Sequence, residues 1–240
     1  MVEQWTENPR VGGSIPPPGT TFEIILGVAV LQFFAWGINK PGVMDQRTAL
    51  VKTHWAFIAR YDSQLIERGP VMQLDDTSIV TGSTHIVELD SPEEAEKFVN
   101  EEPFAQAGLF DSIIFHRFEL ELGRTQFEFE GISDFPRYFI YCPANEGQED
   151  QRQKLVEAHE AYCKKFDANF VCRGSIFSEE YSWMGSVFFM EVSSQDKIAT
   201  FLANEPYKVA GLYEKTDIHR WTMGGPRNLN SRGAPINVQQ

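Results

Sequence analysis

Apolar positions follow first a strand-like and then a helix-like spacing, and this order recurs twice along the chain. The run 31–37 is apolar and aromatic throughout, which is typical of a buried strand. From Asp45, the expected N-cap, the spacing becomes that of a helix that ends near Asp62. Residues 64–72 and 79–89 return to strand-like spacing, with a turn between them.

A second helix follows, with a clear start. Ser91 as N-cap, Pro92 at the first helical position and Glu94 two residues later form the sequence of a capping box. The helix is expected to reach about Asn100, and a strand at 112–122 completes the unit. The second half predicts strands at 137–142, 169–177, 183–192 and 216–223, and helices at 150–166 and 195–204.

The two halves also match residue by residue. The segment "FVNEEPFAQAGLFDSIIFHRF" at 98–118 is echoed at 201–221 by "FLANEPYKVAGLYEKTDIHRW", an offset of 103. Further upstream, 45–69 matches 150–174 with an offset of 105. A repeat of about 100 residues is too long for a solenoid unit, so it predicts a duplicated domain.

The order strand, helix, strand, strand, helix, strand predicts an α+β fold of two ferredoxin-like βαββαβ repeats. Packing the two sheets face to face would bury their second faces and give a fused dimeric α/β-barrel, with a pocket between the sheets or beneath a helix–sheet edge. The expected boundaries are an N-terminal arm at 1–20, a first domain at 21–122, a linker at 123–136, a second domain at 137–223 and a C-terminal tail at 224–240.

Composition narrows the choice of partner. The net charge of −13 argues against a nucleic-acid backbone or an anionic membrane as partner. The apolar run "IILGVAVLQFFAWGI" of 15 residues is too short to span a bilayer, and no basic stretch precedes it, so the cytoplasm is expected. The three cysteines match no zinc spacing, which suits free thiols in a reducing compartment.

Several motifs resemble the YCII-related family of the dimeric α/β-barrel superfamily: "RGP" at 68–70, "TGSTHIVELDSPEEAEKF" at 81–98 and "EEPFAQAGLF" at 101–110. The resemblance implies a ferredoxin-like barrel in which a histidine and an aspartate near the pocket are suspected of acid–base work. One member class removes chloride from chlorinated hydroxyhydroquinones, and superfamily relatives isomerise lactones or oxidise aromatics without a metal. The second half departs from the first with Ser175 in place of Pro70.

The catalytic candidates are a histidine and an aspartate in each half. His54 and His159 occupy equivalent helical positions that face the sheet, where a neutral imidazole can exchange a proton near neutral pH. A semi-buried histidine bonded to a carbonyl is the alternative. Asp62 and Asp167 follow eight residues later, about 12 Å along a regular helix, so a direct bond to the histidine is not expected. Each could instead bond the backbone of the turn that ends the helix.

The loop after the second strand offers another carboxylate and the nearby strands offer binding groups. Asp75 and Asp76 could approach His54 from above. Arg68, which precedes a repeated glycine, could pair with a substrate carboxylate, or it could be a surface arginine. His116 shares a strand face with apolar neighbours, which favours it as an inward side chain. The aromatic residues expected to wall the pocket are Trp36, Phe57 and Phe115.

The sequence contains no metal-binding cluster, phosphate loop or dinucleotide motif, so neither metal nor cofactor is expected. We therefore expect a cofactor-independent lyase or isomerase, dehydrohalogenase-like, with a His–Asp acid–base pair and a small anionic substrate, cyclic or aromatic-derived. One alternative is a ligand-binding or accessory subunit, in which the terminal arms hold a homo-oligomer together. A cofactor-free monooxygenase is the other.

Overall fold

The computed structural model describes residues 30–131 and 135–225. Within these ranges eight antiparallel strands form a closed barrel in the order β1-β3-β2-β8-β5-β7-β6-β4. The first half contains β1 (Leu31–Asn39), α1 (Met44–Ile58), η1 (Ala59–Tyr61), β2 (Leu65–Met72), β3 (Val80–Leu89), α2 (Pro92–Glu101), α3 (Pro103–Gln106) and β4 (Phe110–Leu120). The short η2 (Gln126–Glu128) follows, and the second half contains β5 (Arg137–Pro143), α4 (Glu149–Cys163), η3 (Lys164–Phe166), β6 (Phe170–Phe177), β7 (Trp183–Glu191), α5 (Gln195–Asn204), α6 (Pro206–Val209) and β8 (Asp217–Trp221).

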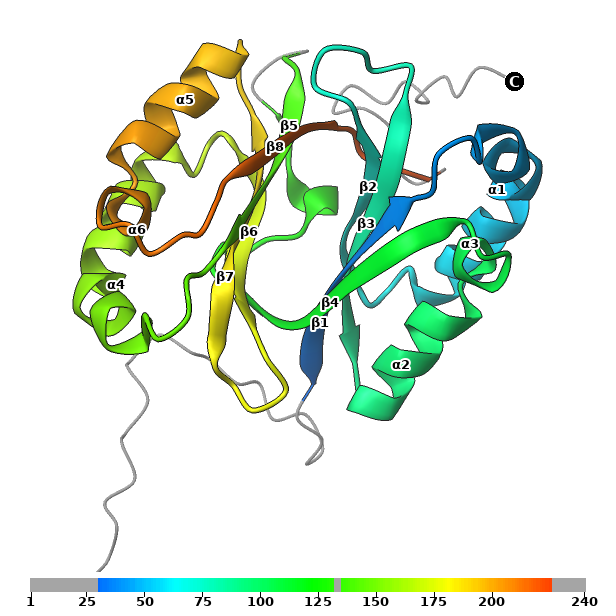
Figure 1. The fold of residues 1–240 in the computed structure, drawn as a ribbon, viewed down its shortest axis with the longest axis horizontal. Coiled ribbons are helices and arrows are strands. Elements are labelled where there is room, and N and C mark those ends of the chain that lie inside the picture. The colour runs from blue at the N-terminus through cyan, green and yellow to red at the C-terminus, as the bar shows by residue number, and fades with distance from the viewer. Residues whose placement is uncertain (1–29, 132–134, 226–240) are drawn as a thin grey trace, which may run out of the picture.

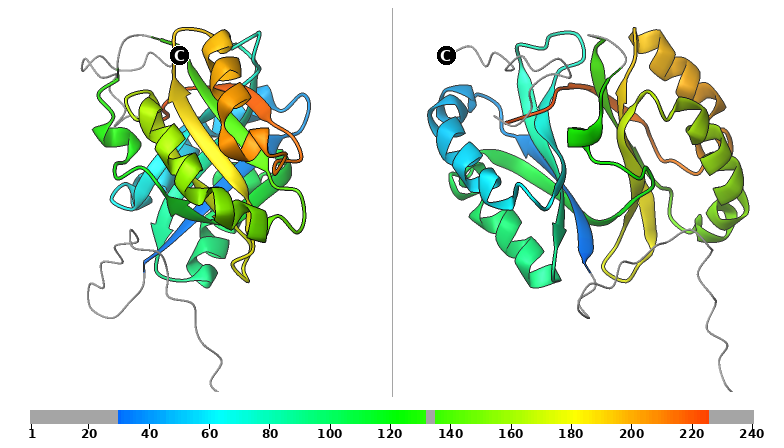
Figure 2. Two further views of the ribbon diagram at one scale, coloured as in Figure 1. Left: turned by 90° about the vertical axis from the view of Figure 1, so that its left-hand side faces the viewer. Right: turned by 180° about the vertical axis from the view of Figure 1, so that it is seen from behind.

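The predicted fold of two βαββαβ repeats that close into one barrel is confirmed. Figure 1 shows the strands of the two halves face to face in the middle of the molecule, with α1–α3 on one outer side and α4–α6 on the other. The views from the side and from behind show the same arrangement of helix, sheet, sheet and helix (Figure 2). Each half therefore covers one sheet face with its own helices and the other with its partner half.

The barrel closes because the last strand of each half also pairs with a strand of the other half. β8 pairs with β2 at Val71↔Trp221 and Met72↔Arg220. β4 pairs with β6 from Arg117↔Phe177 to Leu120↔Gly174. These two seams join the halves through backbone hydrogen bonds, so neither sheet has a free edge in the closed ring.

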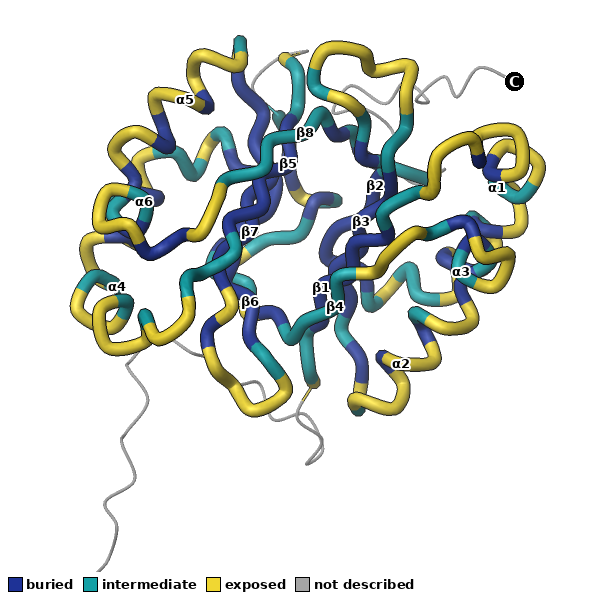
Figure 3. Tube along the Cα trace, viewed as in Figure 1, coloured by how far each residue is buried: buried dark blue, intermediate teal, exposed yellow. Residues whose placement is uncertain are grey.

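The space between the two sheets is filled by large side chains. Trp36 packs edge-on against Phe139, with 4.9 Å between the ring centroids, and against Tyr141 at 5.5 Å. Phe139 in turn stacks on Phe189 at 5.0 Å. Separate apolar clusters lie between each sheet and its own helices. The strands are accordingly the most deeply buried elements, while the outer helix surfaces are exposed (Figure 3).

Two predictions about helix starts had different outcomes. Ser91 caps α2 as predicted, because its side chain accepts a hydrogen bond from the Glu94 N–H; the Glu94 carboxylate accepts from the Asp90 N–H instead of closing the box on Ser91. The prediction that Asp45 caps the first helix is wrong. Val43 is the N-cap residue of α1 and makes no side-chain bond, and Asp45 lies inside the first turn.

The termini fall outside the described ranges. The predicted arm at 1–20 and all of the predicted tail beyond residue 225 lie there. Of the helices that the structure does describe, none combines the length and the apolar character needed to cross a membrane.

The seam between β4 and β6 generates a prediction about Gly174. A Cβ at this position would overlap the Glu119 carbonyl oxygen and the Phe118 ring. We expect Gly174→Ala to lower the free energy of unfolding by about 1–3 kcal/mol, the usual cost of overpacking, measured by urea denaturation. Gly123→Ala is the matched control, because a Cβ there meets nothing within 4 Å. Equal stability of the two variants would contradict the packing described at this seam.

Candidate active site

A histidine from α1 and a glutamate that precedes α3 form a close buried pair. Nδ1 of His54 lies 2.6 Å from Oε1 of Glu102. The second half repeats the pair, with 2.6 Å between His159 Nδ1 and Glu205 Oε1. All four residues are buried. The two halves therefore share one His–Glu arrangement, built twice from the same elements.

The position of Glu102 follows from its local sequence. Pro103 ends α2 and opens α3, so Glu102 becomes the N-cap of a new short helix with an extended backbone. Its Oε2 accepts a hydrogen bond from the Ala105 N–H at 2.9 Å, as N-cap side chains do. Because one carboxylate oxygen is held by the helix, the other is fixed in front of His54.

This contact sets the protonation pattern of the His54 ring. A carboxylate only accepts hydrogen bonds, so Nδ1 of His54 carries the hydrogen and donates it to Glu102. Nε2 of the neutral ring is then the proton acceptor, and no described residue makes a hydrogen bond to it. Burial lowers the pKa of His54 from its ordinary 6.5, although the Glu102 carboxylate opposes this shift. The ring is thus neutral at pH 7, with its free lone pair at Nε2.

Two arginines, Arg47 and Arg68, lie near His54 in addition to the carboxylate of Glu102. Arg47, also from α1, lies 4.2 Å above the centre of the Phe104 ring, and Phe104 stacks on His54 with 4.3 Å between centroids. Its guanidinium donates to Asn39 Oδ1 at 2.9 Å and to the Ser83 hydroxyl. Burial lowers the pKa of Arg47 to about 10, against the opposing charge of Glu102, and leaves the group protonated at pH 7.

A second histidine, His85 of β3, completes this polar cluster. Its ring centroid lies 5.6 Å from that of His54. Burial, together with the nearby guanidinium charges of Arg68 and Arg47, holds the pKa of His85 well below 6.5. The cluster beneath α1 therefore combines two imidazoles, two guanidinium groups and the two carboxylates bonded to His54 and Arg68. The guanidinium groups are the parts of it that can bind an anionic group.

The second half differs in one added carboxylate. Oε2 of Glu121, which follows β4 of the first half, lies 3.6 Å from His159 Nε2. Arg173 donates to the same oxygen at 2.7 Å, and the Ser175 hydroxyl donates to Oε1 at 2.7 Å. Glu121 therefore sits where His159, Arg173 and Ser175 converge.

This carboxylate reverses the charge state of the second histidine. Burial alone would lower the pKa of His159, but its contacts with Cys163, Glu121 and Glu205 raise it well above 6.5. Burial would likewise raise the pKa of Glu121, but His159, Arg173 and Ser175 lower it to about 2. His159 is accordingly a protonated imidazolium in an ion pair, whereas His54 is neutral.

The profile of the YCII-related domain matches residues 31–119 and again residues 137–222, which together make up more than half of the chain. The chain belongs to the YCII-related domain family. The resemblance seen in the sequence is therefore confirmed for both repeats. No curated protein sequence matches the chain.

Several solved structures are similar to these YCII-related repeats. The 5-chloro-2-hydroxyhydroquinone dehydrochlorinase of Burkholderia phenoliruptrix AC1100, in complex with 2,5-dihydroxybenzoquinone, is 28% identical over 37% of this chain and 93% of its own, with a TM-score of 0.35. A chlorite dismutase variant of Candidatus Nitrospira defluvii is 10% identical over 80% of this chain and 91% of its own, with a TM-score of 0.54. A candidate monooxygenase of Fusobacterium nucleatum is 5% identical over 88% of this chain and 97% of its own, with a TM-score of 0.52. The last two share the fold across both YCII-related repeats.

The aspartates singled out from the sequence lie elsewhere in the repeat. Asp62 Oδ1 accepts a hydrogen bond from Arg68 Nη1 at 2.9 Å, and Asp167 lies 4.0 Å from Arg173. Neither makes a hydrogen bond to the histidine of its half. Asp75 and Asp76 lie in the exposed turn between β2 and β3, where Asp76 accepts a hydrogen bond from the Ser78 hydroxyl. The carboxylate bonded to His54 is Glu102.

The predicted binding residues divide between the two faces of the first sheet. Phe57 and Phe115 lie on the helix side, in or against the apolar cluster under α1 and α2. Trp36 lies between the two sheets, in the central aromatic core, and so on the opposite face from His54. His116 shares with Ile114 and Phe118 the face of β4 between the two sheets, so it too lies on the opposite face from His54. Among the predicted binding residues, Arg68 lies close enough to His54 for its positive charge to lower the pKa of that histidine.

Three residues of the site were not predicted. The sequence signal for Glu102 is the pair Glu-Pro at 102–103, which recurs at 205–206. Arg47 recurs as Arg152 in the same way. His85 has Phe188 as its counterpart, so no repetition pointed to it.

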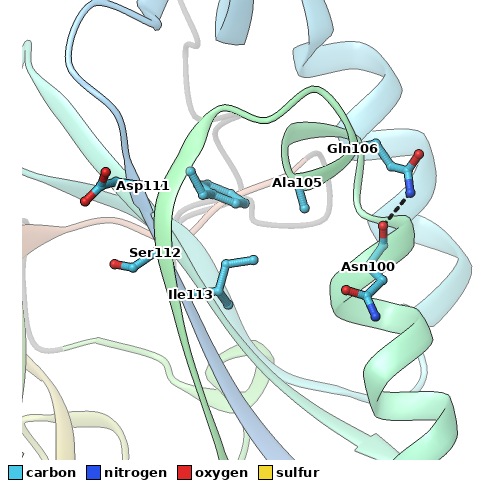
Figure 4. A pocket seen from close by; sticks show the side chains of 7 residues that line it. Asn100, Ala105, Gln106, Asp111, Ser112 and Ile113 are labelled. Carbon is cyan, nitrogen blue, oxygen red and sulfur yellow. Dashed lines mark hydrogen bonds between the residues drawn. The ribbon is translucent and has the colours of Figure 1, made fainter.

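An open groove of about 560 Å³ is lined by the end of α2, by α3 and by the start of β4. Figure 4 shows Asp111 and Ser112 on the strand opposite Asn100 and Gln106 on the helices. On the helical side of the groove, the Gln106 side chain donates a hydrogen bond to the Asn100 carbonyl oxygen at 2.6 Å. Asp111 is the one titratable side chain among the described residues that line this groove.

The ion pair of Glu121 predicts a pH dependence of stability. The pKa of Glu121 is lowered from 4.5 to about 2, so its contribution is present above pH 4.5 and is lost as the pH falls through about 2. We expect Glu121→Gln to lower the free energy of unfolding by about 3 kcal/mol at pH 6, and by progressively less towards pH 2. Urea denaturation at several pH values measures this. Glu119→Gln, which alters the neighbouring carboxylate outside the ion pair, should not reproduce the effect, and a loss for Glu121→Gln that is constant with pH would contradict it.

Proposed function

We propose that the first repeat is the active site of a cofactor-independent lyase or isomerase that acts on a small anionic compound, cyclic or aromatic-derived. The observation that carries this proposal is the 2.6 Å contact that fixes His54 through Nδ1 and leaves Nε2 as a base. A neutral imidazole with a lowered pKa is already deprotonated at pH 7 and can accept a proton without first losing one.

The proposed reaction begins at a carbon next to a carbonyl group of the substrate. His54 Nε2 takes the proton from this carbon, and the electron pair of the broken C–H bond moves into the carbonyl to give an enolate. The positive charges of Arg47 and Arg68 stabilise the negative oxygen that forms. Glu102 stabilises the imidazolium by accepting its Nδ1–H throughout.

The fate of the enolate decides between the two reaction types. In an elimination, the electron pair returns and expels a leaving group such as chloride from the adjacent carbon. In an isomerisation, the His54 imidazolium returns the proton to a different carbon. Both begin with the same proton abstraction, so a single assay detects either. Asp62 takes part in this proposal as a positioning residue, because its contact of 2.9 Å orients Arg68.

Proton exchange with solvent is the direct test of this step. The protein is incubated in D₂O with a panel of chlorinated hydroquinones, hydroxyaromatic acids and lactones, and deuterium uptake and chloride release are followed. We expect His54→Asn to lower the exchange rate of any responsive compound by about 10²–10⁴-fold, the usual contribution of acid–base catalysis. Lys52→Ala, on the exposed side of α1, should leave the rate unchanged. Exchange that persists at full rate in the His54 variant would eliminate the proposal.

Glu102→Gln tests the orienting role separately. The amide can accept the hydrogen bond of Nδ1 but lacks the negative charge that stabilises the imidazolium. We expect a loss of about 10–100-fold in exchange rate. Since the Glu102 carboxylate favours the protonated form of His54, its removal should also move the acid limb of the pH–rate profile to lower pH. If Glu102 had only a structural role, the acid limb of the pH–rate profile would not move.

A further inference from the structure

The two halves of the molecule place equivalent backbone at the same point of each site. The Glu121 N–H donates to the Arg173 carbonyl oxygen at 3.1 Å, and the Gly224 N–H donates to the Arg68 carbonyl oxygen at 3.0 Å. Glu121 and Gly224 are related by the offset of 103 that relates the last strands. Each therefore enters the site of the opposite half along the same path. One brings a carboxylate, and the other brings no side chain.

A second difference accompanies the first. Ser175, whose hydroxyl donates to Glu121, is replaced by Pro70 in the first half. A Cβ at Gly224 would lie 3.3 Å from Pro70 Cδ and 3.1 Å from Gly69 Cα, so Gly224 faces the position that corresponds to Ser175. Glu121, which supplies the anion in the second half, and Ser175, which donates a hydrogen bond to it, thus have no counterparts in the first half. The histidine, the glutamate and the arginine are kept in both.

We propose that Glu121 is a resident substrate mimic: it closes the second site permanently, and its carboxylate marks where the first site binds the carboxylate of its substrate. In the second half, the Glu121 carboxylate lies between the Arg173 guanidinium and His159 Nε2. The corresponding groups in the first half are His54 Nε2 and Arg68, which donates to Asp62 from Nη1 and to the Gly224 carbonyl oxygen from Nε. A bound carboxylate there would be held by Arg68 with the rest of the substrate extending past the base.

This inference rests on the proposed function only for what happens to the substrate after it binds. It implies one working site in each chain, with the second repeat kept as a closed, charge-neutralised copy. It also assigns the substrate class: a small carboxylate whose negative charge replaces that of Glu121. The buried imidazolium of His159 is then a structural ion pair with Glu121 and Glu205, not a catalytic group.

Acetate is the probe, because it is the smallest analogue of the Glu121 side chain. Ring signals of the five histidines, assigned with single variants, are followed by NMR during titration with sodium acetate, against sodium chloride as the ionic-strength control. In the wild-type protein we expect acetate to shift the His54 signals saturably and to raise the pKa of His54, while the His159 signals stay unmoved. A shift of His159, or no shift of His54, would overturn the inference.

Glu121→Ala removes the resident carboxylate and leaves room for a ligand. The pKa of His159 should fall by about one unit or more, and acetate should then shift its signals and restore its high pKa. Glu121→Gln is the matched variant: the pKa should fall in the same way, but acetate should have no effect, because the amide still fills the space. Equal acetate responses in the two variants would contradict a specific carboxylate position.

Gly224→Glu reverses the experiment and does not depend on the stability of the Glu121 variants. It should abolish the acetate response of His54 and raise the pKa of His54, whereas Gly224→Gln should not raise it. Deuterium exchange distinguishes this inference from the proposed function. Exchange that requires His54, with no acetate binding beside it, overturns only the inference. Acetate binding at His54, with no exchange of any panel compound, overturns only the proposed reaction.

Discussion

The pairing of each half's last strand with a strand of the other half is the constraint on which the rest of the structure depends. β8 pairs with β2 and β4 pairs with β6, so the chain that leaves each strand runs directly over the arginine of the opposite half. The backbone hydrogen bonds to Arg68 and Arg173 fix this path at nearly the same distance in both halves. As a result, a residue of the other repeat reaches each site: Glu121 brings a carboxylate to the second half, whereas Gly224 brings only backbone to the first.

Two opposite charge states arise from this shared geometry. The His–Glu pair is the same in both halves, with 2.6 Å between ring nitrogen and carboxylate oxygen. Burial disfavours the imidazolium in each, and one carboxylate partner does not reverse that effect at His54. At His159 the contacts with Cys163 and with a second carboxylate, Glu121, do reverse it. The different charge states of the two histidines therefore depend on these two side chains, of which Glu121 comes from across the seam.

The repeat in the sequence was sufficient to predict the fold and the two histidines, because apolar spacing and duplicated segments are local properties. The partners of those histidines were not predictable in the same way. Glu102, which lies 48 residues after His54 in the chain, meets it only because Pro103 starts a short helix that follows α2 directly. Asp62 was considered for His54, yet its spacing along the helix already placed it beyond reach, and it pairs with Arg68 instead.

Glu121 was predicted only as part of the last strand of the first half. Its contact with His159 depends on the register between β4 and β6, which neither hydrophobic spacing nor the offset between repeats specifies. The barrel interior shows the same limit. Trp36 was expected to line the pocket, but the alternation of side chains along β1 directs it into the core between the sheets. The pairing register between distant strands determines these parts of the site, and local sequence patterns do not specify that register.

The most direct test of this account is an NMR pH titration of His54 and His159 in the wild-type protein. The two rings occupy equivalent positions, so a fold with equivalent sites would give them similar pKa values. The account predicts a pKa below 6.5 for His54 and one well above 6.5 for His159. Titration of both histidines with the same midpoint, or in the opposite order, would contradict it.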